Sequence, residues 1–555
     1  MSTEREGTLA NLGQRQLTRR DLLKLGTTSL AAVGMAACSQ PAAPAATTAP
    51  AATQAPKPAA TSAPAPAATS APAPAATTAP APAAAAKTEI VIARPEEIQK
   101  MDAYDQFNLV NYDLFLHIFD TLVEMDPSGK YIPGLAESWE ASADGLAWTF
   151  KLKKGVKFHN GDPFTSASVK ASLERLKDKK LARATWWAQL DKVDTPDDYT
   201  AIIRTAKPMG TLLSNLITPT VMYSAKQIQA NPTNFFDTPI GTGAFKFVEW
   251  KKNERFVMEA NPDWWKGKPK LTKITYRPIM EDQTRVAGLQ TGEIDIVDTV
   301  PPDQVKVLQA DAKLTILRAV AWDQLYLGLK CDQPPFDKVD ARMAVNYAID
   351  RQTIVSKILE GGRASAAIVP QGELGFSESL KPYPFDVEKA KSLLKSAGWS
   401  GGKIKFIAPQ GWYPKMQEVA EAISAYLKAA GLDNDLSVME GAAFTAARGA
   451  GSYNIYVTGA ATWDPDQIMD QRIRSDVFKS GWVNQQVFDL ILQGQTTVDQ
   501  TKRAKIYQDA QDILYKEGPM IWLYQMEAIY GVKKGINGFQ AYPFKVWDLR
   551  GASWG

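Results

Sequence analysis

The chain has 555 residues, a length that corresponds to several domains at about 150 residues each. Its 63 Lys and Arg against 60 Asp and Glu give a net charge of +3, far from the strongly basic balance typical of nucleic-acid binding. Two histidines exclude a three-histidine zinc site, and two cysteines allow at most one disulfide. The composition predicts a multidomain globular protein without a metal, a cofactor or a nucleic-acid partner.

Residues 1–37 have the pattern of an export signal. Arg19 and Arg20 precede the weakly apolar run Gly26–Ala37. Twelve helical residues span about 18 Å, which is too short for a hydrocarbon core of about 30 Å. The segment is therefore predicted to be a signal peptide, and its paired arginines resemble the twin-arginine export signal.

The small residues before Cys38 resemble a bacterial lipoprotein processing box. Cleavage there would leave Cys38 as a lipid-bearing N-terminus on the outer, periplasmic side of the cytoplasmic membrane. The alternative is an ordinary cleavage site with a fortuitous cysteine, but we favour the lipid anchor. Removal of residues 1–37 takes away five basic and three acidic residues, so the net charge falls from +3 to +1 and no polybasic membrane patch is predicted.

Residues 38–87 are predicted to be a disordered linker. From Pro41 to Lys87, 24 Ala and 11 Pro account for 35 of 47 residues, and an eight-residue unit begins at Thr61, Thr69 and Thr77. In extended polyproline II geometry this linker would reach on the order of 140 Å. It would keep a folded body near a membrane while leaving it free to move.

The folded body is predicted to begin at Thr88. Residues 88–93 read as a strand and residues 112–123 as a helix with apolar periodicity. Residues 146–152 alternate with period two, as a strand does, and residues 165–176 have helical spacing after a candidate N-cap. This alternation predicts an α/β protein.

A series of motifs follows along the chain. They are Leu135–Trp139, Trp148–Lys153, Gly155–Phe158, Gly161–Phe164, Pro239–Phe247, Asn261–Trp265, Gly292–Ile296, Tyr326–Leu329, Pro335–Asp337, Tyr347–Arg351 and Pro384–Trp399. In this order they resemble the signature of family 5 extracellular solute-binding proteins, the peptide-type receptors of ATP-binding-cassette (ABC) importers. Each motif alone is a weak pattern, but the ordered series is specific.

The resemblance implies a fold of periplasmic-binding-protein type, in which two α/β lobes close on a ligand and a third domain enlarges the cleft. Lobe I would comprise 88–121, 237–320 and 525–555, lobe II 122–236, and domain III 321–524. Ligand that contacts both lobes favours the closed state, which the importer's permease subunits would read. We expect a monomer without enzymatic activity.

Several residues in these motifs are predicted to have structural roles. Gly241 and Gly243 are expected to allow a tight turn into a strand. His117 lies in an apolar helix and His159 follows an extended segment, so both are expected to be structural. Cys331 is expected to be a buried small hydrophobe.

The segment that ends in Asp464-Pro465-Asp466 carries the clearest candidates for ligand binding. In peptide-binding relatives, a carboxylate three residues before this motif pairs with the α-ammonium group of the peptide. The matching residue here is Ala461, which weakens a peptide interpretation. Asp464 and Asp466 remain candidates, although an Asp-Pro-Asp turn often caps itself with its own side chains.

Aromatic residues form the second set of candidates, because the chain has 15 tryptophans, and flat indole faces stack on sugar rings while their N–H groups can bond hydroxyls. Trp463 is the first, followed by Trp412 and Tyr413 after a turn, and by Trp322 before the predicted strand 325–329. Core packing is an equally good interpretation for each of them.

Trp186 and Trp187 are weaker candidates, because adjacent residues cannot share one face of a helix. The tryptophans leave open whether the solute is a peptide, an oligosaccharide or another molecule. A secreted glycoside hydrolase of similar size, with cleft carboxylates, is the alternative from another functional class.

Overall fold

The computed structural model describes residues 87–105, 109–218, 220–543 and 545–555. The predicted export signal, Cys38 and nearly all of the predicted linker lie outside these residues, so their assignments stay predictions. Of the helices in the part that is described, none is long and apolar enough to cross a membrane.

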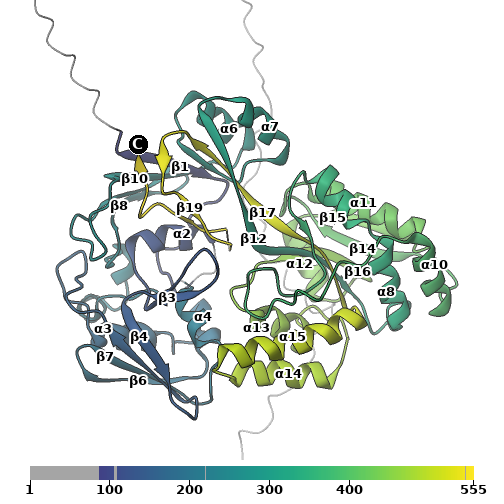
Figure 1. The fold of residues 1–555 in the computed structure, drawn as a ribbon, viewed down its shortest axis with the longest axis horizontal. Helices are drawn as coiled ribbons and strands as arrows, with labels where there is room; N and C mark the ends of the chain where they lie inside the picture. Colours follow the sequence, from purple (N-terminus) through teal and green to yellow (C-terminus); the bar gives the residue numbers. More distant parts are fainter. Residues whose placement is uncertain (1–86, 106–108, 219, 544) are drawn as a thin grey trace, which may run out of the picture. The chain divides into compact units, whose positions relative to one another are not determined.

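A large mixed sheet organises the described residues (Figure 1). Along the sheet its strands are β15 (Asn434–Met439), β14 (Ile404–Pro409), β16 (Ile455–Ala460), β12 (Leu314–Leu329), β17 (Met520–Lys533), β11 (Ile296–Asp298), β1 (Glu89–Arg94), β10 (Lys273–Pro278), β9 (Arg255–Ala260) and β8 (Phe245–Lys251). The short strand β13 (Arg363–Ala364) pairs with β17. Parallel pairing of β1 with β10 and β11, and of β14 with β15 and β16, confirms the predicted α/β class.

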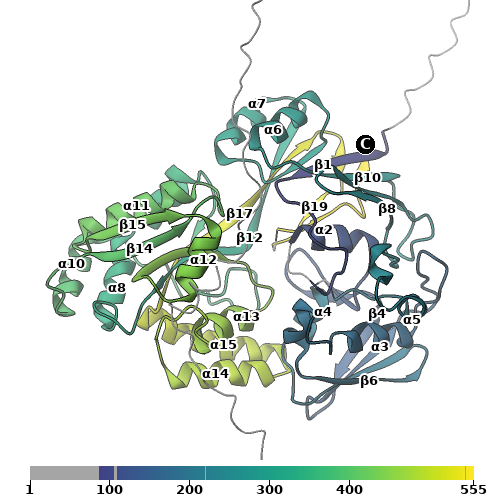
Figure 2. The same ribbon diagram turned by 180° about the vertical axis from the view of Figure 1, so that it is seen from behind.

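The two long strands β12 and β17 run antiparallel through the middle of this sheet, and both views of the ribbon show them side by side (Figures 1 and 2). Their register shifts between Val320 and Gln324 and again between Leu325 and Tyr326. The predicted boundaries 320/321 and 524/525 therefore fall inside paired strands. Such irregularities bend a strand and locally raise its twist, which suits strands that run from the range predicted as lobe I into the range predicted as domain III.

Four smaller sheets complete the β-structure of the described residues. One has the order β4 (Ala136–Ala141), β5 (Ala147–Leu152), β7 (Thr200–Thr205) and β6 (Leu190–Asp197); the others pair β2 (Val123–Met125) with β3 (Tyr131–Pro133), β18 (Ile536–Asn537) with β21 (Ser553–Trp554), and β19 (Gln540–Ala541) with β20 (Trp547–Asp548).

Helices pack on these sheets in separate groups. One group comprises α2 (Leu109–Ile118), α3 (Ser166–Arg175), α4 (Leu212–Ile217) and α5 (Ala225–Ala230). A second comprises α6 (Asp282–Thr291) and α7 (Val305–Ala310), which pack against β11, β12 and β17 (Figure 1). A third comprises α8 (Val339–Ala348), α9 (Arg351–Thr353), α10 (Val387–Ser396), α11 (Met416–Ala429), α12 (Gly441–Gly449), α13 (Pro465–Ile468), α14 (Gln485–Thr496) and α15 (Gln500–Glu517). Helix α3 packs against β6 and β7, whereas α11 packs against β14 and β15.

Buried apolar residues form two large clusters and a small one. The first joins strand β1 to the sheet around β5, so it crosses the predicted boundary between lobes I and II. The second is drawn from residues 325–526, nearly the range predicted for domain III, which therefore has a core of its own. The lobe boundaries themselves stay predictions.

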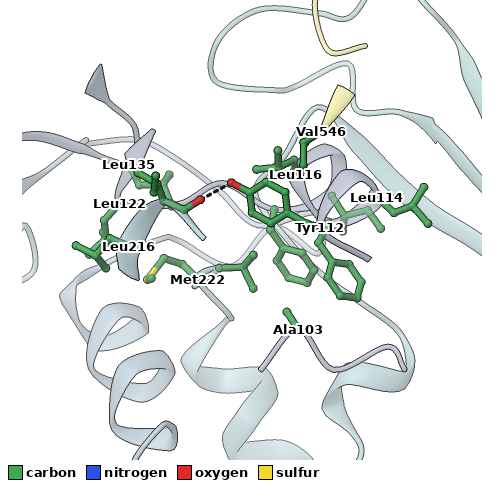
Figure 3. Packing of buried hydrophobic residues seen from close by; sticks show 14 of the residues in the cluster. Ala103, Tyr112, Leu114, Leu116, Leu122, Leu135, Leu216, Met222 and Val546 are labelled. Carbon is green, nitrogen blue, oxygen red and sulfur yellow. Dashed lines mark hydrogen bonds between the residues drawn. The ribbon is translucent and has the colours of Figure 1, made fainter. Parts of the chain in front are cut away.

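Tyr112 shows how the first cluster is built. Its ring packs among apolar side chains and its hydroxyl donates a hydrogen bond to the carbonyl of Ile217, at the end of α4 (Figure 3). The neighbours labelled in the figure are Ala103, Leu114, Leu116, Leu122, Leu135, Leu216, Met222 and Val546. Burial raises the pKa of this phenol, so it remains a neutral donor.

The predicted helix 112–123 is only partly correct. Helix α2 begins at Leu109 and ends at Ile118, whose carbonyl accepts a hydrogen bond from the backbone N–H of Gly243. A Cβ on Gly241 would lie 1.9 Å from the same carbonyl oxygen, and neither glycine has a positive φ. The glycines are therefore required for close backbone approach rather than for the turn that we expected.

The other predicted elements agree with the structure to within a few residues. Strand β1 covers the predicted strand 88–93, and β5 covers 146–152. Helix α3 corresponds to 165–176, with Thr165 at the N-cap in extended conformation but without a capping side-chain bond. The strand predicted at 325–329 is the second part of the much longer β12.

His117, His159 and Cys331 are structural, as predicted. His117 accepts a hydrogen bond at Nε2 from the N–H of Leu549 and donates one from Nδ1 to the carbonyl of Asp113. His159 accepts a hydrogen bond at Nδ1 from the N–H of Gly241 and donates one from Nε2 to the carbonyl of Gly243. Cys331 is buried without a disulfide, and burial raises its pKa to about 12.

Candidate functional site

A cavity of about 370 Å³ lies against the loop that follows β16. On one side it is lined by residues 460–463 and by Gln467, Ile468, Gln471 and Arg472, and on the other by Tyr112, Arg183 and Trp186. The two sides come from the ranges predicted as domain III and as lobes I and II. A ligand held here would contact both.

Trp463, the first aromatic candidate, lines this cavity. It follows β16, and its ring lies 5.1 Å from that of Tyr112, with the two planes tilted by 59°. The indole is half-buried and packs against the first apolar cluster, although β16, the strand before it, belongs to the second. It can therefore offer one aromatic surface to a ligand while the rest of the ring stays packed.

Asp464 is directed away from the cavity. Its carboxylate binds the Arg503 guanidinium through two hydrogen bonds of 2.6 and 2.5 Å, and both side chains are almost completely buried. The same carboxylate accepts the N–H of Asp466 and caps the short helix α13. The Asp-Pro-Asp turn therefore caps itself with its own side chain, which is the alternative to ligand binding that the sequence left open. A buried ion pair further stabilises the turn.

Two further acids lie behind the cavity wall. Glu373 accepts a hydrogen bond of 2.8 Å from Thr462, and burial raises its pKa well above the usual range. Asp466 accepts hydrogen bonds from Gln495 and Tyr507, and burial together with the charge of Asp464 raises its pKa to about 7. These groups fix the loop rather than line the cavity.

Two arginines line the cavity. Arg183 lies in the 3₁₀ segment Ala182–Trp187; its Nε donates to the carbonyl of Ala103 and its guanidinium lies 5.0 Å from the Trp186 ring. Burial lowers its pKa to about 10, so it stays cationic at neutral pH. Arg472 belongs to the π-helical segment Met469–Arg474 and also lines the cavity. Its guanidinium lies 4.4 Å from the Phe478 ring.

A second, larger cavity of about 1000 Å³ contains the candidates Trp412 and Tyr413. Trp412 is 42% exposed and packs edge-on against Phe444. Tyr413 packs over Gly459, at the end of β16, where a Cβ would lie 2.7 Å from its ring. Both cavities therefore flank the same strand end.

The larger cavity is lined by paired charges. Arg94, at the end of β1, binds Asp113 of α2 and lies 3.4 Å from Asp298, the last residue of β11. Across the cavity, Lys545 donates to Asp323 over 2.7 Å. These pairs join the ends of strands around the cavity, and Asp298 and Asp323 each have a cationic partner.

Trp322 belongs to the core. Its side chain is 2% exposed and packs against the close backbone of Gly129 and Gly372. Of the candidates named from the sequence, the structure brings Trp463 to the smaller cavity and Trp412 and Tyr413 to the larger one. Asp464, Asp466 and Trp322 line neither.

Comparisons with known proteins agree with the sequence motifs. Residues 130–476 match the profile of the bacterial extracellular solute-binding proteins, family 5. The chain belongs to this family. The glutathione-binding protein GsiB of Pectobacterium atrosepticum is 29% identical over 485 residues, which cover 84% of this chain and 94% of that protein.

Solved structures of similar proteins share the fold. The periplasmic binding protein DppA from Helicobacter pylori, solved with a peptide, has a TM-score of 0.70 and 26% identity over 84% of this chain and 98% of its own. The binding protein AgaA from A. tumefaciens, solved with agropinic acid, has a TM-score of 0.67 and 30% identity over 82% of this chain and 96% of its own. The family 5 protein described here thus has the periplasmic-binding-protein fold.

Sequence reasoning missed most of the residues that line the smaller cavity of this family 5 protein. Gln467 and Gln471 lie four residues apart, as do Ile468 and Arg472, so both pairs share one helical face after the Asp-Pro-Asp turn. That spacing could have been read from the sequence. In the described residues no group of three or more His, Cys, Asp or Glu side chains could hold a metal ion.

The prediction that Trp186 and Trp187 face different ways is confirmed. The inference that both are therefore weaker candidates for the site does not follow for Trp186. Trp187 is 1% exposed in the core, whereas Trp186 lines the smaller cavity beside Arg183. In the tight 3₁₀ geometry, residues three apart eclipse one another, so Arg183 and Trp186 lie on the same face.

Proposed function

We propose that this family 5 protein is the substrate-binding lipoprotein of an ABC importer, and that it captures a peptide-like solute in the smaller cavity and delivers it to the permease. It would leave the cytoplasm by the twin-arginine route through Arg19 and Arg20, and remain attached to the membrane through a lipid on Cys38. The role as an importer's binding protein follows from family membership; the ligand, the lipid and the route are proposals.

The observation that carries the proposal is the composition of the smaller cavity. Side chains from both sides of the cleft meet there, so a bound solute would stabilise the state in which both sides contact it. Gln467 and Gln471 offer amide donors and acceptors for a peptide main chain, while Trp463 and Trp186 offer aromatic surfaces. We assign Asp464 a role in the fold, because Arg503 occupies its carboxylate.

The glycoside hydrolase alternative finds less support. Such an enzyme needs two carboxylates free to act as acid and as base or nucleophile. Asp464 is bound by Arg503, and Asp298 and Asp323 in the larger cavity have Arg94 and Lys545 as partners. An oligosaccharide solute stays open, because Trp463 and Trp186 would serve it too. Recovery of a bound solute chemically unchanged would favour the receptor.

Replacement of Trp463 by alanine tests the site. Solutes that co-purify with the wild-type protein would first be identified by native mass spectrometry and then titrated into unliganded protein. Trp463→Ala is expected to weaken their binding by about 1–3 kcal/mol, scaled from aromatic contact and burial energies. The melting temperature without solute should change little, because the indole is half-buried.

Trp412→Ala is the matched control, since Trp412 lines only the larger cavity. Its affinity for the same solute should equal that of the wild type. Unchanged affinity in Trp463→Ala, together with a sharp loss of melting temperature, would mean that Trp463 is a core residue and would remove it from the site.

Replacement of Cys38 by alanine tests the anchor. Without the thiol no lipid can be attached, so the protein is expected to move from the membrane fraction to the soluble extracytoplasmic fraction while its melting temperature is unchanged. Cys331→Ala, at the other cysteine, should remain with the membrane. Tight membrane attachment of Cys38→Ala would contradict the lipoprotein assignment.

A further inference from the structure

The charged residues that line the smaller cavity all have the same sign. Among the described residues that line it, Arg183 and Arg472 are cationic and none is an aspartate or a glutamate. The larger cavity differs, since Glu96, Asp298 and Asp323 are among its lining residues. The smaller cavity therefore has a positive lining next to a cavity of mixed charge.

Arg183 is the more buried of the two cations. It is 3% exposed, and this burial lowers its pKa. Nearby tyrosines, Tyr112 foremost, act in the opposite direction and raise the pKa. A cation desolvated in this way gains free energy when an anion enters the cavity beside it, because the interaction takes place at low local dielectric. Its Nε is held by the carbonyl of Ala103, so the guanidinium is positioned in advance.

Arg472 supplies a second donor. Its Nε is buried and has no hydrogen-bond partner among the described residues, and its Nη1 makes only a long bond of 3.4 Å to Gln471. A buried donor without a partner costs free energy that a ligand acceptor would recover. The neighbouring Arg474, in contrast, forms an ion pair with Asp470.

The nearby acids are committed elsewhere. Asp464 binds Arg503, and Asp470 binds Arg474. The carboxyl of Glu373 accepts a hydrogen bond from the hydroxyl of Thr462. Ala461, which is exposed and lines the cavity, brings no charge. A ligand ammonium group would therefore meet two cations and no carboxylate in the lining.

We propose that the smaller cavity selects solutes by an anionic group, such as a carboxylate, which lies between Arg183 and Arg472, with an adjoining planar or apolar part against Trp186 and Trp463. The proposal rests on the proposed binding function and names the class of solute. It predicts that an ammonium group at this position binds more weakly than an anion, because the lining offers it two repelling cations and no carboxylate.

Three probes of nearly equal shape test the charge preference: benzoate, benzamide and benzamidine, which are anionic, neutral and cationic. Each would be titrated to about 100 mM at constant ionic strength, with tryptophan fluorescence and melting temperature as readouts. A charge-assisted bond plus ring stacking predicts millimolar binding of benzoate, at least about tenfold tighter than that of benzamide, and no binding of benzamidine. Equal binding of the three, absence of benzoate binding, or preference for benzamidine would each overturn the proposal.

Matched arginine variants locate the effect. Arg472→Gln is expected to weaken benzoate binding about tenfold or more, and Arg183→Gln likewise. Arg474→Gln carries the same change of charge two residues away, outside the cavity, and should bind benzoate as the wild type does. Equal losses in Arg474→Gln and Arg472→Gln would mean that only the general charge of the surface matters, and would also overturn the proposal.

Ala461→Asp reverses the charge of the lining without removing either arginine. The site is exposed, so the variant is expected to fold with an unchanged melting temperature. It should lose benzoate affinity and gain affinity for benzamidine. If it bound benzoate as tightly as the wild type, the anion would not lie beside Ala461 and the proposal would fail.

The solutes identified by native mass spectrometry separate this proposal from the proposed function. Co-purified solutes that bind at Trp463 but carry only ammonium groups would leave the binding function intact and overturn the anionic selection. Co-purified solutes with a carboxylate or phosphate would support both the binding function and the anionic selection. Loss of their binding when the anion is esterified would identify that anion as the group that the cavity recognises.

Discussion

Replacement of Arg503 by methionine is expected to lower the free energy of unfolding by about 3–5 kcal/mol, because it leaves the Asp464 carboxylate buried without its partner. The guanidinium is fully buried, makes two bonds to Asp464 and also donates to the hydroxyl of Tyr507 and the carbonyl of Gly494. Methionine keeps most of the volume but none of these bonds. Urea unfolding followed by tryptophan fluorescence measures the loss.

The double variant Arg503→Met with Asp464→Asn is the control, since it removes the uncompensated charge. It should recover much of the lost stability, because neutral partners cost less to bury than one unpaired carboxylate. A loss below about 1 kcal/mol in Arg503→Met would mean that the pair is solvated like a surface salt bridge and would contradict its structural role.

Acidification from pH 7 to pH 4 is expected to reduce the contribution of each histidine to stability by about 3 kcal/mol. Burial lowers the pKa of His117 and of His159 to about 4, whereas an unfolded histidine takes up its proton near pH 6.5. Between these values the unfolded chain binds more protons than the folded one. This stability is therefore present above pH 6.5 and is lost as the pH falls toward 4.

Variant comparisons isolate this effect, because buried acids act in the opposite direction. The pKa of Asp466 is raised to about 7, so its ionisation destabilises the fold as the pH rises from 4 to 7. The difference in unfolding free energy between the wild type and His159→Gln should shrink by about 3 kcal/mol from pH 7 to pH 4. A difference that stays constant over this range would show that His159 titrates normally.

The secondary structure followed the sequence where local patterns and burial agreed. Strands β1 and β5 and helix α3 lie where period and flanking residues predicted them. The predicted helix 112–123 ended early because the carbonyl of Ile118 is used by the backbone of Gly243, more than a hundred residues away. No pattern within the helix carries that information.

The sequence by itself determined the family, through an ordered series of motifs over most of the chain, and it singled out the segment around Asp464 and Trp463. It did so because these features are local: turns, strand ends and their spacing depend on residues that are close in the sequence. Trp463 could be named a candidate for the same reason, since it stands directly before the turn that follows β16.

Only the tertiary structure decided where each candidate lies and what it contacts. Asp464 is bound to Arg503, 39 positions further along the chain, so a carboxylate that looked available for a ligand serves the fold. Arg183 and Trp186 reach the cavity from the opposite side, about 280 residues before Trp463. The physical reason is that burial and charge pairing depend on which distant segments contact one another, and a cavity lined by segments far apart in the chain depends on the same contacts.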